Sequence, residues 1–471
     1  AGEVLLRLPL SHAVTADFCR DDGSDSTIRA LVEALKASAE AIEVAQWTWI
    51  ALYMLAHSQL SSKSPTLTER RFESALKAEY VDAALAYFPT FWDDETLDWL
   101  NGTDLRDVHI LDVHAAIETE YHKLVYLVPS VHDSLPAIDF KKWAMIVMSR
   151  GETMDLPEKG NSSHLVPQLV LMPLVDLADH HLPLPESPLS TEDDLQAYQE
   201  AGARTRVSFD GEASAVVLKA TAAFGPATSA EVTVGYGVRS NADYLLYHGF
   251  AMSQAWSDAL VCILHSSVEL PLPEGLPPWK SQFLEHPFRF LVPACPSRKS
   301  KPDLVLGAAR FLVATEADLA SFQERGASDP SLSAEAAPAR EDKFLQQGAR
   351  KALSTLCDVT AAPPVCRLPL SLDSERRAWA LIRNRTVARV AAHVNSVDDD
   401  DRLLRQDDAS GDLTVNQRHA VIVRREEKLG LQRWCSLVVM VSDFLDQPEG
   451  ERALELVRVS DGEALETDEP R

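Results

Sequence analysis

Apolar and polar positions alternate at the start of the chain and then change to a helical spacing. Residues 2–14 alternate and contain Pro9, which predicts a short strand that leads into a turn. Beyond Asp25, the hydroxyls of Ser26 and Thr27 are suited to cap a helix, because they can accept hydrogen bonds from free backbone N–H groups. The apolar residues that follow recur at helical spacing: Ile28, Leu31, Val32, Leu35 and Ile42.

The helical pattern continues through the next hundred or so residues. Residues 47–60 predict a second apolar helix, and residues 61–142 are mostly helical, with a break at the aromatic and proline residues 87–89. Residues 143–148 form one continuous apolar stretch. Residues 151–164, by contrast, have the composition of a loop.

Short strand-like runs follow. Residues 207–209, 215–218 and 232–234 predict strands. The charged, proline-rich residues 183–200 predict an exposed loop or insertion. From about residue 265 the helical pattern returns.

The last third of the chain is mostly helical in pattern. Residues 326–342 are low in apolar content and predict a loop, whereas residues 369–445 predict long helices that include the acidic run 398–401. The tail from Asp461 is polar. The order of strand, helices, strands and helices predicts an α+β fold, in which a core carries a large helical insertion and a helical C-terminal domain.

Composition and charge narrow the classes of partner. Hydrophobic residues make up 46% of the 471 residues and charged residues 25%, which is typical of a globular protein. The formal net charge of −26 repels phosphate, so we expect no nucleic-acid partner and no membrane insertion. A protein partner with a basic segment is favoured instead. We find no apolar run long enough to span a bilayer.

The cysteines predict free thiols. There are six, and no two form a C-x-x-C pair or have histidines at zinc-finger spacing: Cys19, Cys262, Cys295, Cys357, Cys366 and Cys435. This pattern favours a soluble protein in a reducing compartment, either the cytosol or the interior of an organelle.

Asp179, His180 and His181 are the clearest candidate for a metal site. Asp and His bind divalent cations, but adjacent residues rarely chelate one ion alone, and no second cluster accompanies them. We therefore expect no metal. The G-x-G-x-x-G, Walker A, G-x-S-x-G and H-E-x-x-H motifs do not occur, which disfavours the commonest nucleotide-binding, hydrolase and zinc-protease classes.

Residues 231–250 hold the most informative pattern. By itself the pattern predicts a strand, a glycine-rich turn around Tyr236, and a helix that carries Leu245 and Leu246. Glycines on both sides of an aromatic residue let the backbone pass close to another group. Without further context, a tight turn with a packed tyrosine is the favoured interpretation.

Three segments, in this order along the chain, resemble a known family. Residues 143–150 read WAMIVMSR, residues 171–180 read LMPLVDLADH, and residues 235–250 read GYGVRSNADYLLYHGF. These strings resemble the motifs of SET-domain protein methyltransferases, in the branch that includes Rubisco large-subunit lysine methyltransferase and actin-histidine methyltransferase.

The resemblance extends over nearly the whole chain. Residues 2–9 resemble a strand of the SET core, and residues 91–103 resemble the family's helical insertion. Residues 396–404 and 416–431 resemble its helical substrate-binding domain. The domains that this implies are the N-terminal part of the SET core at residues 1–25, the helical insertion at 26–142, the C-terminal part of the core at 143–264, and an all-helical substrate-binding domain at 265–471.

The resemblance implies a cofactor and a set of site residues. The cofactor is S-adenosyl-L-methionine (AdoMet), and Tyr236 is the catalytic residue, whose hydroxyl orients the reacting group in a narrow channel. Glu152 and Val175 are implied to line the substrate channel, and no metal is implied. The implied cofactor-binding residues are Arg150, Asp176, Asp179, His180, Asn241, His248, Gly249 and Phe250.

The chain departs from the family pattern at several positions. Asp179 stands where the family has Asn, and a buried carboxylate without a partner is costly. Glu152 stands where lysine enzymes tend to have an aromatic residue and the histidine enzyme has Asn. His248 replaces the usual aromatic residue before the final Gly-Phe. The family's glycine-rich strand is expected before residue 1.

Two functions remain open on the sequence. The first, which motif order and Tyr236 favour, is an AdoMet-dependent protein N-methyltransferase that acts on a Lys or His side chain of a protein. The alternative is a SET-like protein that has lost turnover and serves as a structural or assembly subunit. Fold alone does not decide between them.

Overall fold

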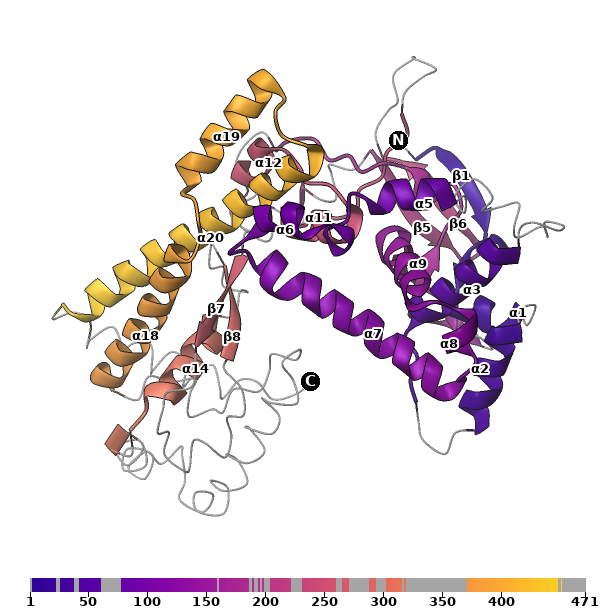
Figure 1. Ribbon diagram of the computed structural model, residues 1–471, viewed down its shortest axis with the longest axis horizontal. Coiled ribbons are helices and arrows are strands. Elements are labelled where there is room, and N and C mark those ends of the chain that lie inside the picture. Colours follow the sequence, from indigo (N-terminus) through magenta and orange to yellow (C-terminus); the bar gives the residue numbers. More distant parts are fainter. Residues whose placement is uncertain are drawn as a thin grey trace. The chain divides into compact units, whose positions relative to one another are not determined.

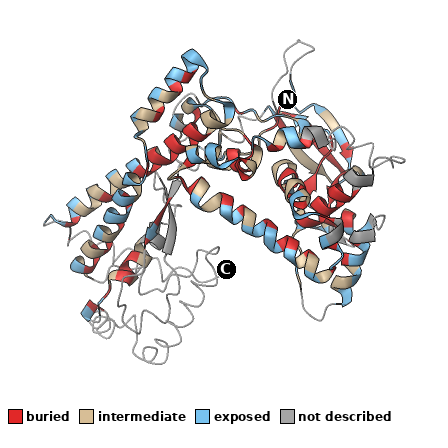
Figure 2. Cartoon of the chain, viewed as in Figure 1, coloured by how far each residue is buried: buried red, intermediate tan, exposed pale blue. Residues whose placement is uncertain are grey.

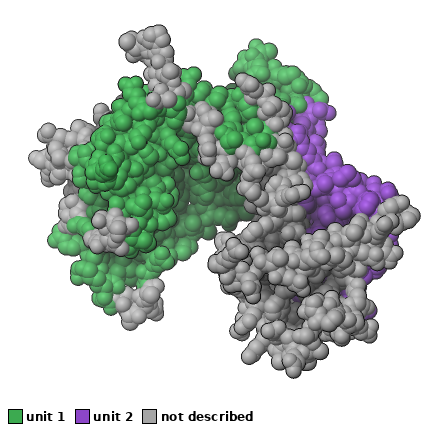
Figure 3. All heavy atoms as spheres, turned by 180° about the vertical axis from the view of Figure 1, so that it is seen from behind, with its two compact units in different colours: residues 1–189, 193–259, 400–424 green, residues 190–192, 260–399, 425–471 purple. Residues whose placement is uncertain are grey.

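The computed structural model describes only part of the chain. The described residues are 2–22, 26–37, 42–60, 78–158, 161–185, 189, 194, 197–198, 204–221, 231–259, 265–270, 288–293, 302–315, 317–318, 371–447 and 450. The chain divides into two compact units, coloured separately in Figure 3. Unit 1 comprises residues 1–189, 193–259 and 400–424, and unit 2 comprises residues 190–192, 260–399 and 425–471.

The described strands of unit 1 form two antiparallel sheets of three strands each, and the strands of the first sheet are labelled in Figure 1. In the first sheet, β6 (Ala215–Ala220) lies between β1 (Val4–Pro9) and β5 (Thr205–Asp210). In the second, β4 (Asn161–Leu171) lies between β2 (Val14–Thr15) and β3 (Glu152–Glu158). A small apolar core that includes Leu8, Leu156, Val170, Val175 and Val216 draws on both sheets.

Helices supply the larger core of unit 1. Residues 48–56 of α3 (Gln46–Leu60) are all buried, as expected for a helix that is apolar on every side. It packs against α9 (Ala137–Arg150). By contrast, α7 (Ile110–Leu127) buries one face only, as Figure 2 shows.

The other helices that the structure describes in unit 1 are short. The α-helices are α1 (Ala16–Asp22), α2 (Ser26–Ala37), α5 (Ala78–Leu85), α6 (Asp94–Leu97), α8 (Val131–Ser134), α11 (Asn241–His248) and α12 (Gln254–Ala259). The tighter or wider turns are η1 (Leu10–His12), η2 (Pro89–Phe91), η3 (Asp98–Leu100), η4 (Leu105–His109) and η5 (Val175–Leu177).

Among its described residues, unit 2 is mainly helical and contains a two-stranded antiparallel sheet. Its described elements are β7 (His265–Leu270), β8 (Phe288–Pro293), α14 (Pro302–Val313) and α18 (Leu372–Ala391). Two long helices, α19 (Val397–Ser410) and α20 (Val415–Leu445), carry residues assigned to both units. The core of unit 2 joins Val268 and Leu270 of β7, Leu312 of α14, Ile382 of α18 and Trp434 of α20.

Several local predictions are confirmed and others are wrong. The strand at residues 2–14, the helices at 26 and 47, the break near residue 88 and the long helices of 369–445 are present. Residues 151–164 were expected to be a loop, but they contain the whole of β3 and the start of β4. The helical pattern expected from residue 265 misses the β7–β8 pair. Ile42 lies beyond the end of α2.

Other sequence predictions are contradicted or fall outside the described residues. Residues 232–234 make a single bridge rather than a strand. The predicted loop at 326–342 and the tail from Asp461 lie outside the described residues, and so does most of 183–200. Of the described cysteines, Cys19 is buried, Cys435 is half-buried, and both are free thiols. No helix among the described residues is long and apolar enough to cross a membrane.

Candidate functional site

Two segments far apart in the sequence lie side by side and place Tyr236. His180 and Val234 form a parallel bridge, in which the N–H of Val234 donates to the Asp179 carbonyl over 3.0 Å. The N–H of His181 donates to the Val234 carbonyl over 3.1 Å. Two residues further on, the backbone N–H of Tyr236 donates to Nδ1 of His180 over 3.0 Å. The turn after Val234 is thereby fixed against the segment that contains His180.

The hydroxyl of Tyr236 points at a backbone carbonyl. It donates a hydrogen bond to the oxygen of Ala178 over 2.8 Å. Burial raises the pKa of Tyr236 to about 12, the carboxylate of Asp179 adds to this rise, and Arg150 opposes it. Tyr236 is therefore a neutral phenol at physiological pH, suited to hydrogen bonding rather than to complete proton transfer.

Helix α11 forms the wall beside Tyr236. Its start is capped by Ser240, whose side chain accepts a hydrogen bond from the N–H of Asp243. Its end is Gly249, whose left-handed φ of 77° is costly for any other residue. A Cβ at Gly249 would lie 3.1 Å from Cβ of Tyr87, so the backbone also comes close to its neighbour there.

Three side chains of α11 bond to backbone groups outside the helix. Oδ1 of the buried Asn241 accepts from the N–H of Met252 over 2.6 Å. The hydroxyl of Tyr244 donates to the Gly237 carbonyl over 2.6 Å. Nδ1 of His248 lies 3.1 Å from the Ser149 carbonyl, to which it donates because a carbonyl oxygen is only an acceptor. These bonds fix the position of α11 along its axis and its rotation about that axis.

Aromatic rings fill the space between α11 and the His180 segment. The ring of Tyr236 lies 4.8 Å from His248 and 5.2 Å from His180, centroid to centroid. Phe250 stacks on Tyr244 at 5.2 Å and on His180 at 5.9 Å. Such a cluster excludes water and presents flat faces, which suits the binding of a planar heterocycle.

Both histidines of the cluster are neutral. Burial lowers the pKa of His180 to about 4, and burial together with Arg239 lowers the pKa of His248 to about 4. Among the described residues, Nε2 of each ring is buried and has no hydrogen-bond partner. Since Nδ1 of His180 accepts and Nδ1 of His248 donates, the free nitrogen is a donor on His180 and an acceptor on His248.

Charged groups also lie near Tyr236. Nη1 of Arg150, at the end of α9, donates to the Asp176 carbonyl over 3.0 Å and lies 3.8 Å from the Asp176 carboxylate. The Asp176 side chain is only 3% exposed, and burial raises its pKa to about 6 although Arg150 opposes the rise. Desolvation also raises the pKa of Glu152, against the opposing effect of Arg239.

The structure brings most of the predicted site residues together. Arg150, Asp176, His180, Tyr236 and His248 are linked by the contacts above. The others take the following positions: Asn241 at the start of α11, Gly249 and Phe250 after its end, and Glu152 at the start of β3.

Two of the predicted residues have surroundings that the sequence did not indicate. Asp179 is exposed, so its carboxylate does not carry the cost of burial that its place in the motif suggested. Val175 is buried in the apolar core shared by the two sheets, beside Met172.

Sequence reasoning missed several groups of the site. The carbonyls of Ala178 and Ser149 carry no side-chain signal, so no sequence pattern could have identified them. Tyr244 and Arg239 lie within the recognised motif, and Tyr244 shares a helix face with Asn241 and His248 at helical spacing, which could have indicated it. The described residues contain no group of three His, Cys, Asp or Glu side chains able to hold a metal ion.

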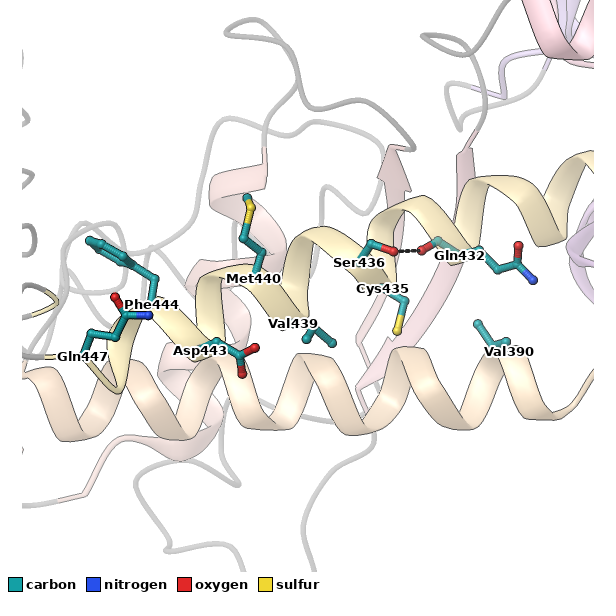
Figure 4. Close-up of a pocket in the computed structure, with 9 residues that line it drawn as sticks. All are labelled: Val390, Gln432, Cys435, Ser436, Val439, Met440, Asp443, Phe444 and Gln447. Carbon is teal, nitrogen blue, oxygen red and sulfur yellow. Dashed lines mark hydrogen bonds between the residues drawn. The ribbon is translucent and has the colours of Figure 1, made fainter.

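A separate groove lies within unit 2. It has a volume of about 850 Å³ and lies along α20, facing α18 (Figure 4). Val439 and Cys435 of α20 point toward α18, from which Val390 projects. Met440 and Phe444 of the same groove are exposed apolar side chains. None of the residues predicted for the site lines this groove.

Comparison with known proteins identifies the class of fold. Residues 275–429 match the family described as Rubisco LSMT substrate-binding. The whole chain is similar to the crystal structure of the SET domain of LSMT bound to methyllysine and AdoHcy, with a TM-score of 0.59 and 17% identity over 96% of this chain and 86% of that one. It is also similar to the structure of Rubisco LSMT bound to AdoMet, with a TM-score of 0.58 and 18% identity over 96% and 86%.

The chain therefore has the fold of the SET-domain methyltransferases. More particularly, it has the architecture of Rubisco LSMT, with a substrate-binding domain of that type in its C-terminal half. The resemblance seen in the sequence and the α+β fold class are confirmed. No curated protein matches the sequence significantly. The domain boundaries set out above stay predictions.

Proposed function

We propose that this protein is an AdoMet-dependent protein N-methyltransferase that acts on a Lys or His side chain. The observation that carries the proposal is the Tyr236 hydroxyl, held 2.8 Å from the Ala178 carbonyl between charged groups and an aromatic wall. The resemblance assigns this tyrosine to the methyl-transfer channel. The proposal is supported by neighbours of the same fold that are bound to AdoMet or to AdoHcy with methyllysine.

The residues present fit AdoMet. Arg150 is about one-third exposed at 30% and offers guanidinium N–H groups for a carboxylate. The exposed carboxylate of Asp179 suits a cationic group, and the rings of His180 and Phe250 suit the faces of adenine. When bound, AdoMet supplies a methyl group on an electron-poor sulfonium.

The contribution of the protein is alignment and exclusion of water. Tyr236 stays protonated and bonded to Ala178, so its oxygen keeps one orientation toward an incoming nitrogen. The half-buried aromatic cluster removes water from one side of that position. The acidic groups Glu152 and Asp179, together with the net charge of −26, favour a target segment with basic residues.

Calorimetric titration with AdoMet and AdoHcy tests the proposal. We expect micromolar affinity, roughly −8 kcal/mol. Methyl-labelled AdoMet should then label Lys- or His-containing peptides, and Tyr236→Phe should lower the rate by about a hundredfold or more while leaving cofactor affinity nearly unchanged. Tyr126 is exposed, so Tyr126→Phe is the matched control and should change neither the rate nor the cofactor affinity.

The assembly-subunit alternative rests on the replacement at Glu152, since the exposure of Asp179 removes the burial cost that its place in the motif suggested. It requires that neither AdoMet nor AdoHcy binds at millimolar concentration. If the protein binds the cofactor but methylates neither Lys nor His peptides, the proposed target class is wrong and the proposed cofactor site is retained. The choice between Lys and His follows from which peptide set is labelled.

A further inference from the structure

His248 touches two parts of the site at once. Its ring lies 4.8 Å from the ring of Tyr236, the shortest ring-to-ring distance in the aromatic cluster. Its Nδ1–H donates to the carbonyl of Ser149, the residue before Arg150. The imidazole therefore joins the end of α9 to the face of the Tyr236 ring.

The backbone around His248 leaves this side chain little freedom. It is the last residue of α11, and the left-handed Gly249 that follows packs against Tyr87 and Phe88. Tyr244, one turn earlier, is tied to the Gly237 carbonyl, which lies next to Tyr236 in the sequence. Helix α11 thus cannot slide or rotate without breaking contacts at both ends.

We propose that His248 is a positioning residue for Tyr236, which holds the phenol ring by direct ring contact and is itself held by its hydrogen bond to Ser149. This role differs from the contact with the cofactor that the family resemblance implies for His248. The positioning role of His248 rests on the proposed function in one respect, namely that Tyr236 is taken to be the catalytic residue.

The neutral state of His248 suits this role. A position at the C-terminal end of a helix favours the protonated ring, but burial and Arg239 outweigh that effect and lower the pKa of His248 to about 4. A neutral imidazole packs on the phenol without stabilising the phenolate. An imidazolium at the same place would lower the pKa of Tyr236 and weaken its hold on the hydroxyl proton.

Two substitutions separate the ring from the hydrogen bond. His248→Asn keeps an N–H donor for Ser149 and removes the ring, whereas His248→Phe keeps a ring and removes the donor. The readout is the pKa of Tyr236, followed by NMR on protein carrying ring-labelled tyrosine, with Tyr236→Phe identifying the signal. In His248→Asn we expect this pKa to fall from about 12 by about one unit or more as water reaches the ring, while His248→Phe keeps it within about half a unit.

Controls make the result decisive. His181→Ala, at an exposed neighbour of His180, should leave the pKa of Tyr236 unchanged. AdoHcy affinity, measured by calorimetry, should change less than about twofold in His248→Phe, and a loss of more than about tenfold would assign His248 to the cofactor and overturn the proposal. An unchanged Tyr236 pKa in His248→Asn would overturn it as well.

Two complications are covered by the same design. If His248→Asn does not fold, a fall of about one unit in the Tyr236 pKa of His248→Phe overturns the role of the ring, and its retention supports it. If AdoHcy does not bind to the unsubstituted protein, the proposed function fails, whereas the titration of Tyr236 still decides what His248 does.

Discussion

The backbone N–H of Tyr236 donates a hydrogen bond to Nδ1 of His180 over 3.0 Å. A neutral imidazole has one N–H, so the proton of His180 is on Nε2. His248 donates from Nδ1 and has the opposite tautomer. We expect nitrogen-detected NMR at neutral pH to show the proton of His180 on Nε2 and that of His248 on Nδ1, with the two signals assigned by means of His180→Gln and His248→Asn. Two identical tautomers would contradict the hydrogen bonding described here.

Half-buried histidines should make the protein sensitive to acid. Burial lowers the pKa of His180, His248 and His419 to about 4, below the ordinary value of 6.5. Between these values the unfolded chain binds more protons than the folded one. The free energy of unfolding therefore falls as the pH is lowered from 6.5 to 4. Urea denaturation across this range should show a falling free energy of unfolding, with a smaller fall in His419→Phe.

Asp176 should act in the opposite direction over part of the same range. Its pKa is raised by burial to about 6, so between about pH 4 and 6 the folded protein binds the extra proton and stability falls as pH rises. The ionised carboxylate costs about 3 kcal/mol at neutral pH. Asp176→Asn should therefore steepen the rise in stability between pH 4 and 6.5. An unchanged slope would show that Asp176 titrates normally.

Gly249 should tolerate alanine less well than Gly411 does. Both have a positive φ, 77° at Gly249 and 68° at Gly411, which costs an alanine about 1–2 kcal/mol. Only at Gly249 does the added Cβ meet a neighbour, 3.1 Å away at Tyr87, and overpacking adds about 1–3 kcal/mol. Urea denaturation of the two alanine variants measures the difference. Equal losses would mean that the contact with Tyr87 relaxes freely.

The sequence predicted this part of the chain well because its signals are local. The glycine-rich turn and the helix bearing Leu245 follow from spacing within residues 231–250, and the structure has α11 there. The two strands around residues 151–164 were missed because Gly151, Pro157 and several polar residues suggest a loop. They are strands because β4 pairs with β3 on one side and β2 on the other, which is a non-local cause.

The site was predictable only as a set of residues, not as a geometry. The motifs gave Tyr236, His180 and His248, but not the tautomers of the histidines, which depend on backbone partners distant in sequence. Nor could sequence show that Asp176 is buried while Asp179, three residues later, is exposed. Those properties arise when the segments meet in the fold.

The buried ion pair between Arg424 and Asp400 should be costly to break. Nε of Arg424 lies 3.1 Å from Oδ1 of Asp400, the side chains are 6% and 0% exposed, and Nη1 also donates to the Trp99 carbonyl. Asp400→Ala leaves a buried guanidinium without its carboxylate and should cost about 3–5 kcal/mol in urea denaturation.

An exposed pair provides the control for that prediction. Lys36 and Glu33 lie 2.8 Å apart with side chains 66% and 67% exposed, so Glu33→Ala should change stability by about 0.5 kcal/mol or less. The double substitution Asp400→Leu with Arg424→Met should cost less than Asp400→Ala alone, because no charge stays buried. A double variant as unstable as the single one would show that packing, not charge, sets the cost.

Helix α11 has only eight residues, yet three of its side chains bond to three separate backbone segments. A rotation of the helix as a rigid body would break all three bonds together. The wall beside Tyr236 therefore has no low-energy form in which only some of these bonds are broken. Amide exchange at Tyr236, Met252 and the amides of α11 should then proceed through one shared opening event. In terms of cooperativity, the site is a single folding unit that is either complete or lost.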